Sequence, residues 1–146
     1  IDRLVRILLI KVLRGHVSEL PAQCASWLKA LADPDIGRAL ALMHAQPNAG
    51  WTVAALAERV AMSRSAFASR FVELVGRPPM EYLTRWRIEK ACALLRTTRA
   101  GLKEVATRVG YKSASAFSKA FANAVGVAPG AYRQSVGAAL RFWLQE

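Results

Sequence analysis

The side-chain types that most often perform catalysis or bind metals are few in this sequence and lie far apart. The two cysteines, Cys24 and Cys92, lack Cys-x-x-Cys spacing, so we expect two buried thiols in a reducing compartment rather than a disulfide framework or zinc site. His16 and His44 are isolated, which does not favour a metal or catalytic role. No carboxylate pair, Gly-rich phosphate loop or nucleophile–base pattern is present. We therefore predict that the chain is not an enzyme and has no metal or cofactor.

Charge is the chemical property that stands out. The 146 residues carry 21 Lys and Arg against 10 Asp and Glu, a formal net charge of +11. Residues 52–133 hold 14 of the basic residues and 5 of the acidic ones, a net +9. A basic surface of this size fits a polyanionic partner, because counterions released from that partner favour binding. Charge alone leaves double-stranded DNA, RNA and an anionic membrane surface open.

No segment of the sequence is predicted to cross a membrane. The apolar run over 4–13 is interrupted by Arg6 and Lys11 and is too short to span a bilayer. No secretory signal is visible either. We expect a cytoplasmic protein.

The basic region contains one stretch twice. When residues 63–82 are aligned with 113–132, a shift of fifty, nine of the twenty positions are identical. These are Ser63/Ser113, Ser65/Ser115, Ala66/Ala116, Phe67/Phe117, Phe71/Phe121, Val75/Val125, Gly76/Gly126, Pro79/Pro129 and Tyr82/Tyr132. Upstream, a shift of forty-nine aligns the apolar residues, so the second copy has one extra residue in its turn. Because two copies are too few for a solenoid, we interpret the pattern as a duplicated module.

Each copy has the pattern of two helices joined by a tight turn. In the first copy, Thr52 can cap a helix with apolar residues at helical spacing, and Ser63 can cap the next one. Apolar residues at i, i+4 and i+7 of the second helix predict a buried stripe, made of Phe67, Phe71 and Leu74 in one copy and Phe117, Phe121 and Ala124 in the other. The opposite face has small and mostly polar side chains. This is the helix-turn-helix plan, although many short helical hairpins never contact DNA.

No β-type alternation occurs, so the predicted fold class is all-α, with two helix-turn-helix subdomains joined by a long linker helix and preceded by extra N-terminal helices. We divide the chain into 1–50, 51–134 and 135–146. Within the middle part we place the first helix-turn-helix at 52–75, the linker helix at 79–96 and the second helix-turn-helix at 102–125. A continuous linker of eighteen residues would be roughly 27 Å long. Successive major grooves lie roughly 34 Å apart on one face of B-DNA, so two reading helices on such a linker could reach both.

The two ends of the chain are also predicted to be helical. Residues 1–14 carry more apolar side chains than one buried face requires. Two interpretations remain open: the additional apolar side chains pack in the core of the same chain, or they form a homodimer through Ile1–Leu13. Because the chain opens without methionine inside an amphipathic pattern, we expect the carboxyl-terminal piece of a longer protein. Asp33-Pro34 predicts the start of another helix, and 46–50 predicts a loop. A last helix at 135–144 is expected to pack back through Leu140, Trp143 and Leu144.

Four sequence motifs together resemble the DNA-binding domain of the AraC/XylS family of bacterial transcription regulators. They are Gly126-Val-Ala-Pro129-Gly-Ala-Tyr132-Arg133, Val105-Ala106-x-x-Val109-Gly110-Tyr111-x-Ser113, Phe117-Ser118-x-x-Phe121 and Pro79-Met-Glu-Tyr82-Leu83-x-x-Trp86-Arg87. The match covers about 52–133. Upstream, Trp27 and 33–40 resemble the segment that joins this domain to a cupin-like sensor in one subgroup.

The resemblance implies a sequence-specific regulator that inserts one recognition helix per copy into successive major grooves and recruits or blocks RNA polymerase; we expect an activator. The effector, if there is one, would be bound by a sensor domain preceding this chain. The implied base-reading residues are Arg64, Ser65, Ala68 and Ser69 in the first copy and Ala114, Ser115, Ser118 and Lys119 in the second. Phosphate contacts are expected from Arg70, Arg85, Arg99, Lys112 and Arg133.

Small side chains occupy positions where the family often has longer ones. Serine can bond several bases and alanine can touch a thymine methyl, but neither discriminates between bases as a bidentate Arg or Asn does. We therefore expect Arg64 and Lys119 to carry most direct readout, with DNA shape supplying the rest.

Two other function classes compete with this interpretation. A sequence-independent architectural or RNA-binding protein would satisfy the charge, although the duplicated helix-turn-helix pattern argues against it. A thiol-based enzyme or alkyl acceptor could use Cys92 or Cys24, but neither cysteine has a basic or helix-start context that favours the thiolate.

Overall fold

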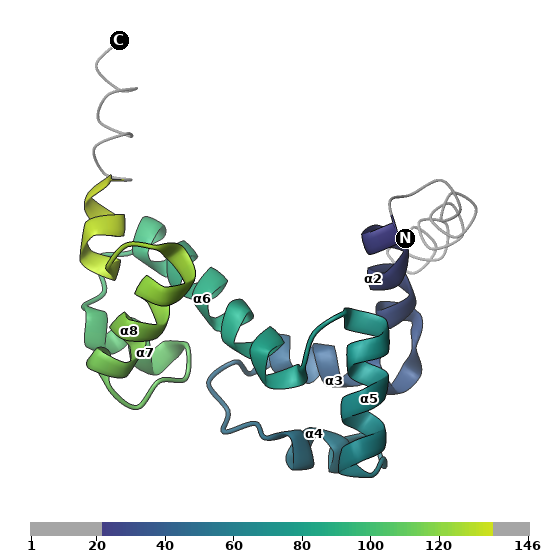
Figure 1. Ribbon diagram of the computed structural model, residues 1–146. Helices are drawn as coiled ribbons and strands as arrows, with labels where there is room; N and C mark the ends of the chain where they lie inside the picture. The colour runs from purple at the N-terminus through teal and green to yellow at the C-terminus, as the bar shows by residue number, and fades with distance from the viewer. Residues whose placement is uncertain (1–21, 136–146) are drawn as a thin grey trace, which may run out of the picture.

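The computed structural model describes residues 22–135, and this part of the chain is helical with no strand, which confirms the all-α prediction (Figure 1). Its helices are α2 (Ala22–Ala32), α3 (Pro34–Ala45), α4 (Val53–Arg59), α5 (Arg64–Val75), α6 (Pro79–Thr97), α7 (Leu102–Arg108) and α8 (Ala114–Val125). A further helical segment runs from 129 to 135. The predictions for 1–14 and for the packing of 135–144 lie outside the described residues. No helix between 22 and 135 is long and apolar enough to cross a membrane.

The predicted helix boundaries are formed by the expected capping residues. Asp33 accepts hydrogen bonds from the backbone N–H groups of Asp35 and Ile36 at 3.1 and 2.9 Å, and so caps α3. The Ser63 hydroxyl accepts from Ala66 N–H, and the Ser113 hydroxyl accepts from Ala116 N–H, each at 3.2 Å. Each bond satisfies one of the amide groups left without a partner at a helix start.

Two hydrophobic cores lie at the two ends of the linker helix α6. The first is formed by α2 to α5 and the start of α6, and the second by the end of α6 with α7 and α8. Phe67, Phe71, Phe117 and Phe121 are fully buried in these cores, as the stripes predicted. Leu74 is only half-buried and Ala124 is exposed, so the prediction was wrong for Ala124: its one-carbon side chain makes no part of the second core, against which the neighbouring Val125 packs.

The duplication in the sequence is also a duplication in space. In the first core, the rings of Phe67 and Phe71 lie 5.7 Å apart, and Tyr82 meets Phe71 edge-on at 5.9 Å. The second core repeats the arrangement, with 5.7 Å between its two phenylalanines and 5.5 Å from Phe121 to Tyr132. Three of the nine shared residues therefore form an aromatic ladder in each copy, which holds each second helix against α6 or the segment after α8.

The hydrogen bonds of the two turns locate the extra residue. Met62 N–H donates to Ala57 O at 3.0 Å, and Tyr111 N–H donates to Ala106 O at 2.8 Å. Because these two bonds are equivalent, Met62 aligns with Tyr111, and the shift of forty-nine still holds at this position. The shift becomes fifty at Ser63 and Ser113. The extra residue is therefore Lys112, which lies exposed directly before the cap of α8.

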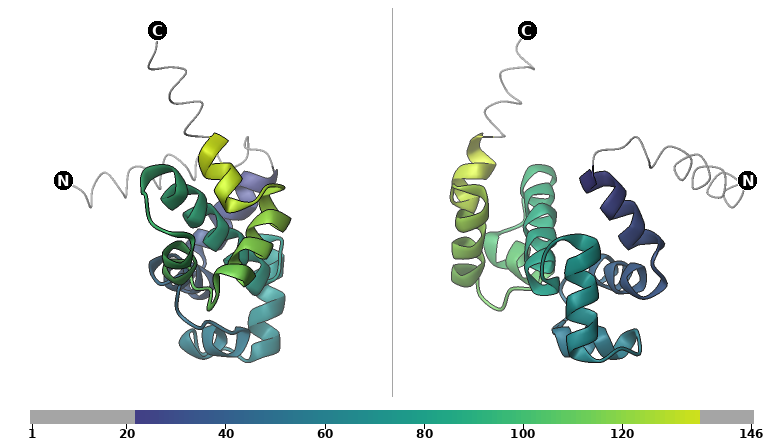
Figure 2. Two further views of the ribbon diagram at one scale, coloured as in Figure 1. Left: turned by 90° about the vertical axis from the view of Figure 1, so that its left-hand side faces the viewer. Right: turned by 45° about the vertical axis from the view of Figure 1, so that its right-hand side comes forward.

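The linker helix α6 belongs to both cores. Leu83 is buried in the first core and Leu95 in the second. In Figures 1 and 2 the helix runs from the α2–α5 lobe to the α7–α8 lobe and carries the two helix-turn-helix units at its ends. The fold thus holds α5 and α8 on one continuous helical support.

Candidate nucleic-acid interface

The first candidate reading surface combines the face of α5 opposite its buried phenylalanines with the first residue of the helix. Ser65 and Ser69 are exposed on that face, Ala68 beside them is half-buried, and Arg64 is exposed at the N-terminal end of α5. Phe67 and Phe71 hold the other face in the core, so the orientation of α5 about its axis is determined by packing. All four residues with an implied base-reading role are therefore accessible, and their contact with bases stays a prediction.

The second candidate surface is the corresponding face of α8. Ser115 and Lys119 are exposed, whereas Ala114 and Ser118 are half-buried. The helix contains no acidic residue, so nothing within it opposes the approach of a polyanion. Both surfaces are slim, which suits a helix that must enter a groove about 12 Å wide.

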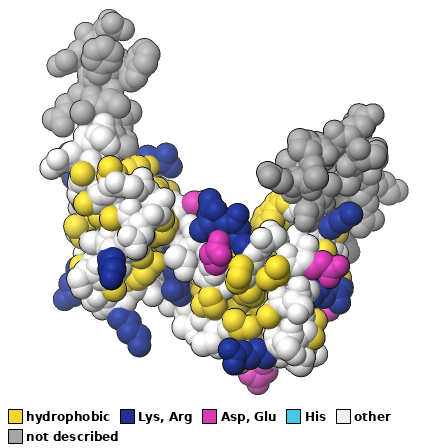
Figure 3. Space-filling model, viewed as in Figure 1, with side chains coloured by type: hydrophobic (Ala, Val, Ile, Leu, Met, Phe, Trp, Pro, Cys, Tyr) yellow, Lys and Arg dark blue, Asp and Glu magenta, His cyan; other side chains and the backbone are white. Residues whose placement is uncertain are grey.

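Basic side chains occur on both lobes and between them. On the face drawn in Figure 3, several Lys and Arg side chains lie over both lobes, with fewer acidic ones among them. Arg85, Arg99 and Lys112, for which phosphate contacts are predicted, are all exposed. Their assignment stays a prediction.

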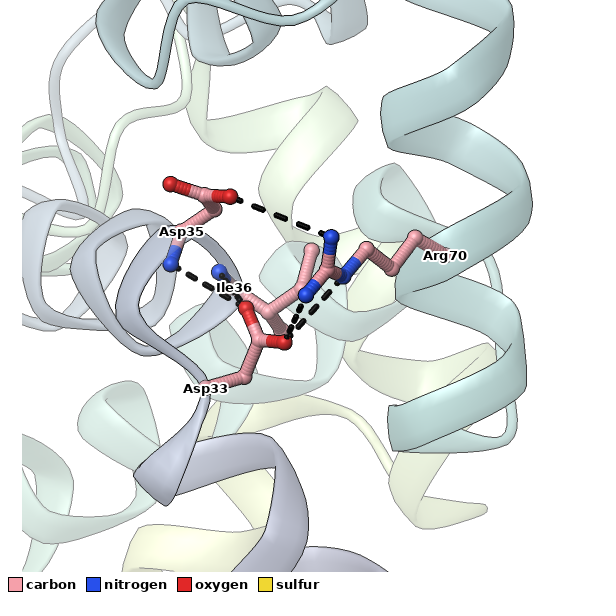
Figure 4. A network of polar contacts seen from close by, with 4 residues as sticks. All are labelled: Asp33, Asp35, Ile36 and Arg70. Carbon is pink, nitrogen blue, oxygen red and sulfur yellow. Dashed lines mark hydrogen bonds and ion pairs between the residues drawn. The ribbon is translucent and has the colours of Figure 1, made fainter.

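Arg70 has a partner within the protein. Its Nε donates to Oδ2 of Asp33 at 3.1 Å, a second guanidinium nitrogen donates to the same oxygen, and Asp35 lies 3.9 Å away (Figure 4). Partial burial works to raise the pKa of Asp33, but the hydrogen bonds from Ile36 N–H, Arg70 and Asp35 N–H outweigh it and hold that pKa below its usual value. Arg70 therefore ties α5 to the start of α3. A phosphate contact from this side chain would have to break that ion pair.

Arg133 is likewise engaged internally. Its Nη2 donates to the carbonyl oxygen of Ala100 at 2.6 Å, which ties the segment after α8 to the loop before α7. Its Nε is buried and has no hydrogen-bond partner among residues 22–135. The side chain is half-buried, so its predicted phosphate contact competes with a structural role.

His44 packs against α6, and Cys92 lies within that helix. His44 Nε2 lies 2.6 Å from the Tyr82 hydroxyl, and its ring stacks on Trp86 with centroids 4.0 Å apart. Burial, with help from the nearby Lys90, lowers the pKa of His44. Cys92 is half-buried rather than buried, against the second core. Among the described residues no group of His, Cys, Asp and Glu could hold a metal ion, and the side chain of Cys24 lies outside them.

Sequence reasoning gave no role to Arg87, although the residue closes the linker motif. Its guanidinium donates to two backbone carbonyls of the 46–50 loop, at 2.7 Å to Pro47 O and 3.1 Å to Ala49 O. The only available signal was its place next to Trp86 in the motif, which does not reveal a partner forty positions earlier.

Comparison with known proteins agrees with this geometry. A family model described as a helix-turn-helix domain matches residues 56–135. An AraC-like transcription regulator of Streptomyces lividans is 47% identical over 133 residues, which are 91% of this chain and 44% of that protein. The chain belongs to the AraC family. The regulator AlkR of Acinetobacter baylyi is 41% identical over 133 residues, 91% of this chain and 43% of its own. The chain thus spans less than half the length of these AraC-family relatives.

Solved structures show the same family. The DNA-binding domain of AdpA, solved in complex with a target DNA, superposes with a TM-score of 0.70 and is 34% identical, over 73% of this chain and 96% of that domain. The C-terminal domain of AraT, a response regulator from Geobacillus stearothermophilus, gives a TM-score of 0.68 at 32% identity, over 70% of this chain and 86% of that one. The AraC-type fold and the resemblance drawn from the motifs are confirmed. The family is one of transcription regulators and not of enzymes.

Proposed function

We propose that this chain is a two-headed, sequence-specific reader of double-stranded DNA that lays α5 and α8 into successive major grooves. The observation that carries the proposal is the repeated, slim and exposed face on two helices held by one continuous support. The nineteen residues of α6 extend over about 28 Å, close to the roughly 34 Å between successive major grooves on one face of B-DNA. We call α5 and α8 with their turns the two heads. The aromatic ladder of each head determines the orientation of its second helix about the helix axis.

Direct base reading in this proposal depends mainly on one long side chain in each head. Arg64 stands at the first position of α5, and Lys119 stands in the middle of α8. Either can donate to O6 and N7 of guanine. The serines and alanines around them permit close approach of the helix and add contacts of lower discrimination. Sequence-dependent DNA shape supplies further specificity.

Phosphate contacts fix the register of the two heads. Arg85, Arg99 and Lys112 are the assigned residues, and each is exposed. Lys112 is well placed for such a role because the extra residue of the second turn lies directly before a helix N-terminus, where phosphate is also favoured by the helix dipole.

For the whole protein we propose a cytoplasmic transcription regulator that acts as an activator by contacting RNA polymerase. The support is that its relatives are named as transcription regulators and that this chain corresponds to less than half of each. An effector would then bind a separate sensor domain, and a homodimer would form through Ile1–Leu13. In vitro transcription from a promoter carrying the selected site, with and without the full protein, tests the polymerase contact.

Selection of bound duplexes from a random pool, at two salt concentrations, tests the DNA-reading proposal. We expect two short boxes about one helical turn apart, retained at the higher salt. Affinity that falls steeply with salt and enriches no sequence would instead establish a non-specific basic protein, the architectural or RNA-binding alternative.

A further inference from the structure

The linker helix contacts the loop that precedes the first reading head. Arg87 of α6 donates through Nε to Pro47 O at 2.7 Å and through Nη2 to Ala49 O at 3.1 Å. Both carbonyls belong to the connection between α3 and α4. Two bonds from one planar guanidinium fix the direction of that side chain as well as its distance. Burial lowers the pKa of Arg87, although an arginine stays charged at neutral pH.

The turn of the second helix-turn-helix meets the same loop. Gly110 has φ +95°, and a Cβ built on it would lie 2.8 Å from Pro47 O, 2.9 Å from Asn48 Cα and 3.0 Å from Arg87 Cζ. Tyr111 follows directly, and the guanidinium carbon of Arg87 lies 5.9 Å from the centre of its ring. Elements of both lobes therefore converge on one arginine of the linker helix.

The first copy provides an internal comparison. Ala61 occupies the position of Gly110 and also has positive φ, at 54°, but it carries a side chain and is exposed. A turn at φ 54° therefore tolerates a Cβ, whereas φ +95° at Gly110 is strained for any residue with a side chain. The close approach to the 46–50 loop is a second distinguishing feature of this turn, and it is a contact between lobes.

We propose that Arg87, Gly110 and Tyr111, together with the 46–50 loop, form an interlobe clamp that fixes the angle between α5 and α8. A single helix leaves the two lobes free to bend and twist relative to each other, whereas a second contact beside it restrains both motions. The clamp determines which separations of the two DNA boxes are accepted, and Arg87 acts as a positioning residue without touching DNA. This inference rests on the proposed two-headed function.

A rigid pair of heads must discriminate against wrong box spacing. One added base pair moves the second box by about 3.4 Å and turns it by about 35°. If one head loses its base contacts for this reason, the affinity of the protein for that duplex falls about tenfold or more. Releasing the clamp lets the lobes follow the displaced box, so the ratio of affinities for native and altered spacing falls towards one.

The test uses the full chain with duplexes obtained from the selection described above, in versions with native spacing, one base pair inserted, one removed, and each box alone. The variant is Arg87→Met, which keeps length and loses the donors. Its matched control is Arg96→Met, which removes the same charge from an exposed position of the same helix. We expect Arg87→Met to lower the spacing discrimination severalfold while single-box affinities stay as in wild type. Arg96→Met should preserve the ratio.

A second pair of variants addresses the close approach itself. Gly110→Ala should lower the discrimination, and Ala61→Gly, its counterpart in the first turn, should not. Gly110→Ala can also unfold the second lobe. Its spacing discrimination is therefore compared with wild type only if the variant keeps its affinity for the box bound by that lobe. If that affinity is lost, the test of the clamp rests on Arg87→Met. Unchanged spacing discrimination in a folded Arg87→Met protein would overturn the clamp.

A measurement without DNA separates failure of the clamp from failure of the proposed function. Residual dipolar couplings of the free protein should fit one alignment tensor for both lobes in wild type and in Arg96→Met. Arg87→Met should require two. If the selection enriches no sequence, the DNA-reading proposal fails, and the clamp is then tested by the couplings alone. One shared tensor in Arg87→Met would refute the clamp.

Discussion

Removing one buried aromatic ring should strongly destabilise one lobe and leave the other intact. Phe117 is fully buried, with ring centroids 5.6 Å from Tyr111 and 5.7 Å from Phe121. Phe→Ala at such a site costs about 3–5 kcal/mol, because transfer free energy is lost and a cavity remains. Whole domains are stable by only about 5–15 kcal/mol, and small ones lie near the lower end. Phe117→Ala should therefore bring the second lobe close to its unfolding midpoint in buffer at 25 °C.

Hydrogen exchange of backbone amides, followed by mass spectrometry across a urea series, measures the two lobes separately. In Phe117→Ala the peptides of α7 and α8 should lose protection at much lower urea than in wild type. Peptides of α4 and α5 should keep theirs. Phe67→Ala should give the reverse pattern, since Phe67 belongs to the first core.

The matched control is Val72→Ala, a truncation in the same helix as Phe67 at a side chain that is 42% exposed. Its unfolding free energy should change by no more than about 0.5 kcal/mol. A loss below about 1 kcal/mol in Phe117→Ala, or equal loss of protection in both lobes, would refute the description of two separate aromatic cores.

Three further outcomes follow from the same structure. Ser63→Ala and Ser113→Ala should each cost about 0.5–2 kcal/mol in urea unfolding, because each removes the acceptor for an amide at a helix start; no loss would contradict the capping role. Asp33→Asn keeps a capping side chain but loses the charge. Because folding lowers the pKa of Asp33, the charged carboxylate stabilises the fold fully at pH values above its ordinary pKa of 3.8. This stabilisation is lost as the pH falls through the pKa of Asp33 in the folded state. The stability difference between wild type and Asp33→Asn should thus shrink from pH 7 to pH 3 in urea titrations, and a constant difference would show that the ion pair does not stabilise the fold. Cys92→Ala should leave DNA affinity and selected sequence unchanged in binding assays, whereas loss of binding would revive a thiol-based role.

The features that were predictable from sequence are those whose partners lie within one helical turn. Ser63 and Ser113 cap helices through an amide three residues ahead, and the buried phenylalanines follow from spacing along one helix. Local chemistry is sufficient in both cases, because the backbone itself places the partner.

The roles of individual arginines were not predictable in the same way. Arg70 pairs with Asp33, 37 positions earlier, and Arg87 with Pro47, 40 positions earlier. Every arginine carries the same charge and reach, so only the tertiary arrangement decides which guanidinium finds an internal acceptor and which stays in solvent. The sequence predicted a basic surface. The structure adds which arginines bind acceptors within the protein and which remain exposed to solvent.

The most direct test of the two-headed account is to repeat the random-duplex selection with Arg64→Ala and with Lys119→Ala. Both side chains are exposed, so neither change should lower the unfolding temperature. We expect each variant to lose sequence information in one box and keep it in the other, and we expect the two variants to affect different boxes. Loss in the same box, or a uniform weakening that leaves both boxes as sharp as in wild type, would refute the assignment of one box to each head.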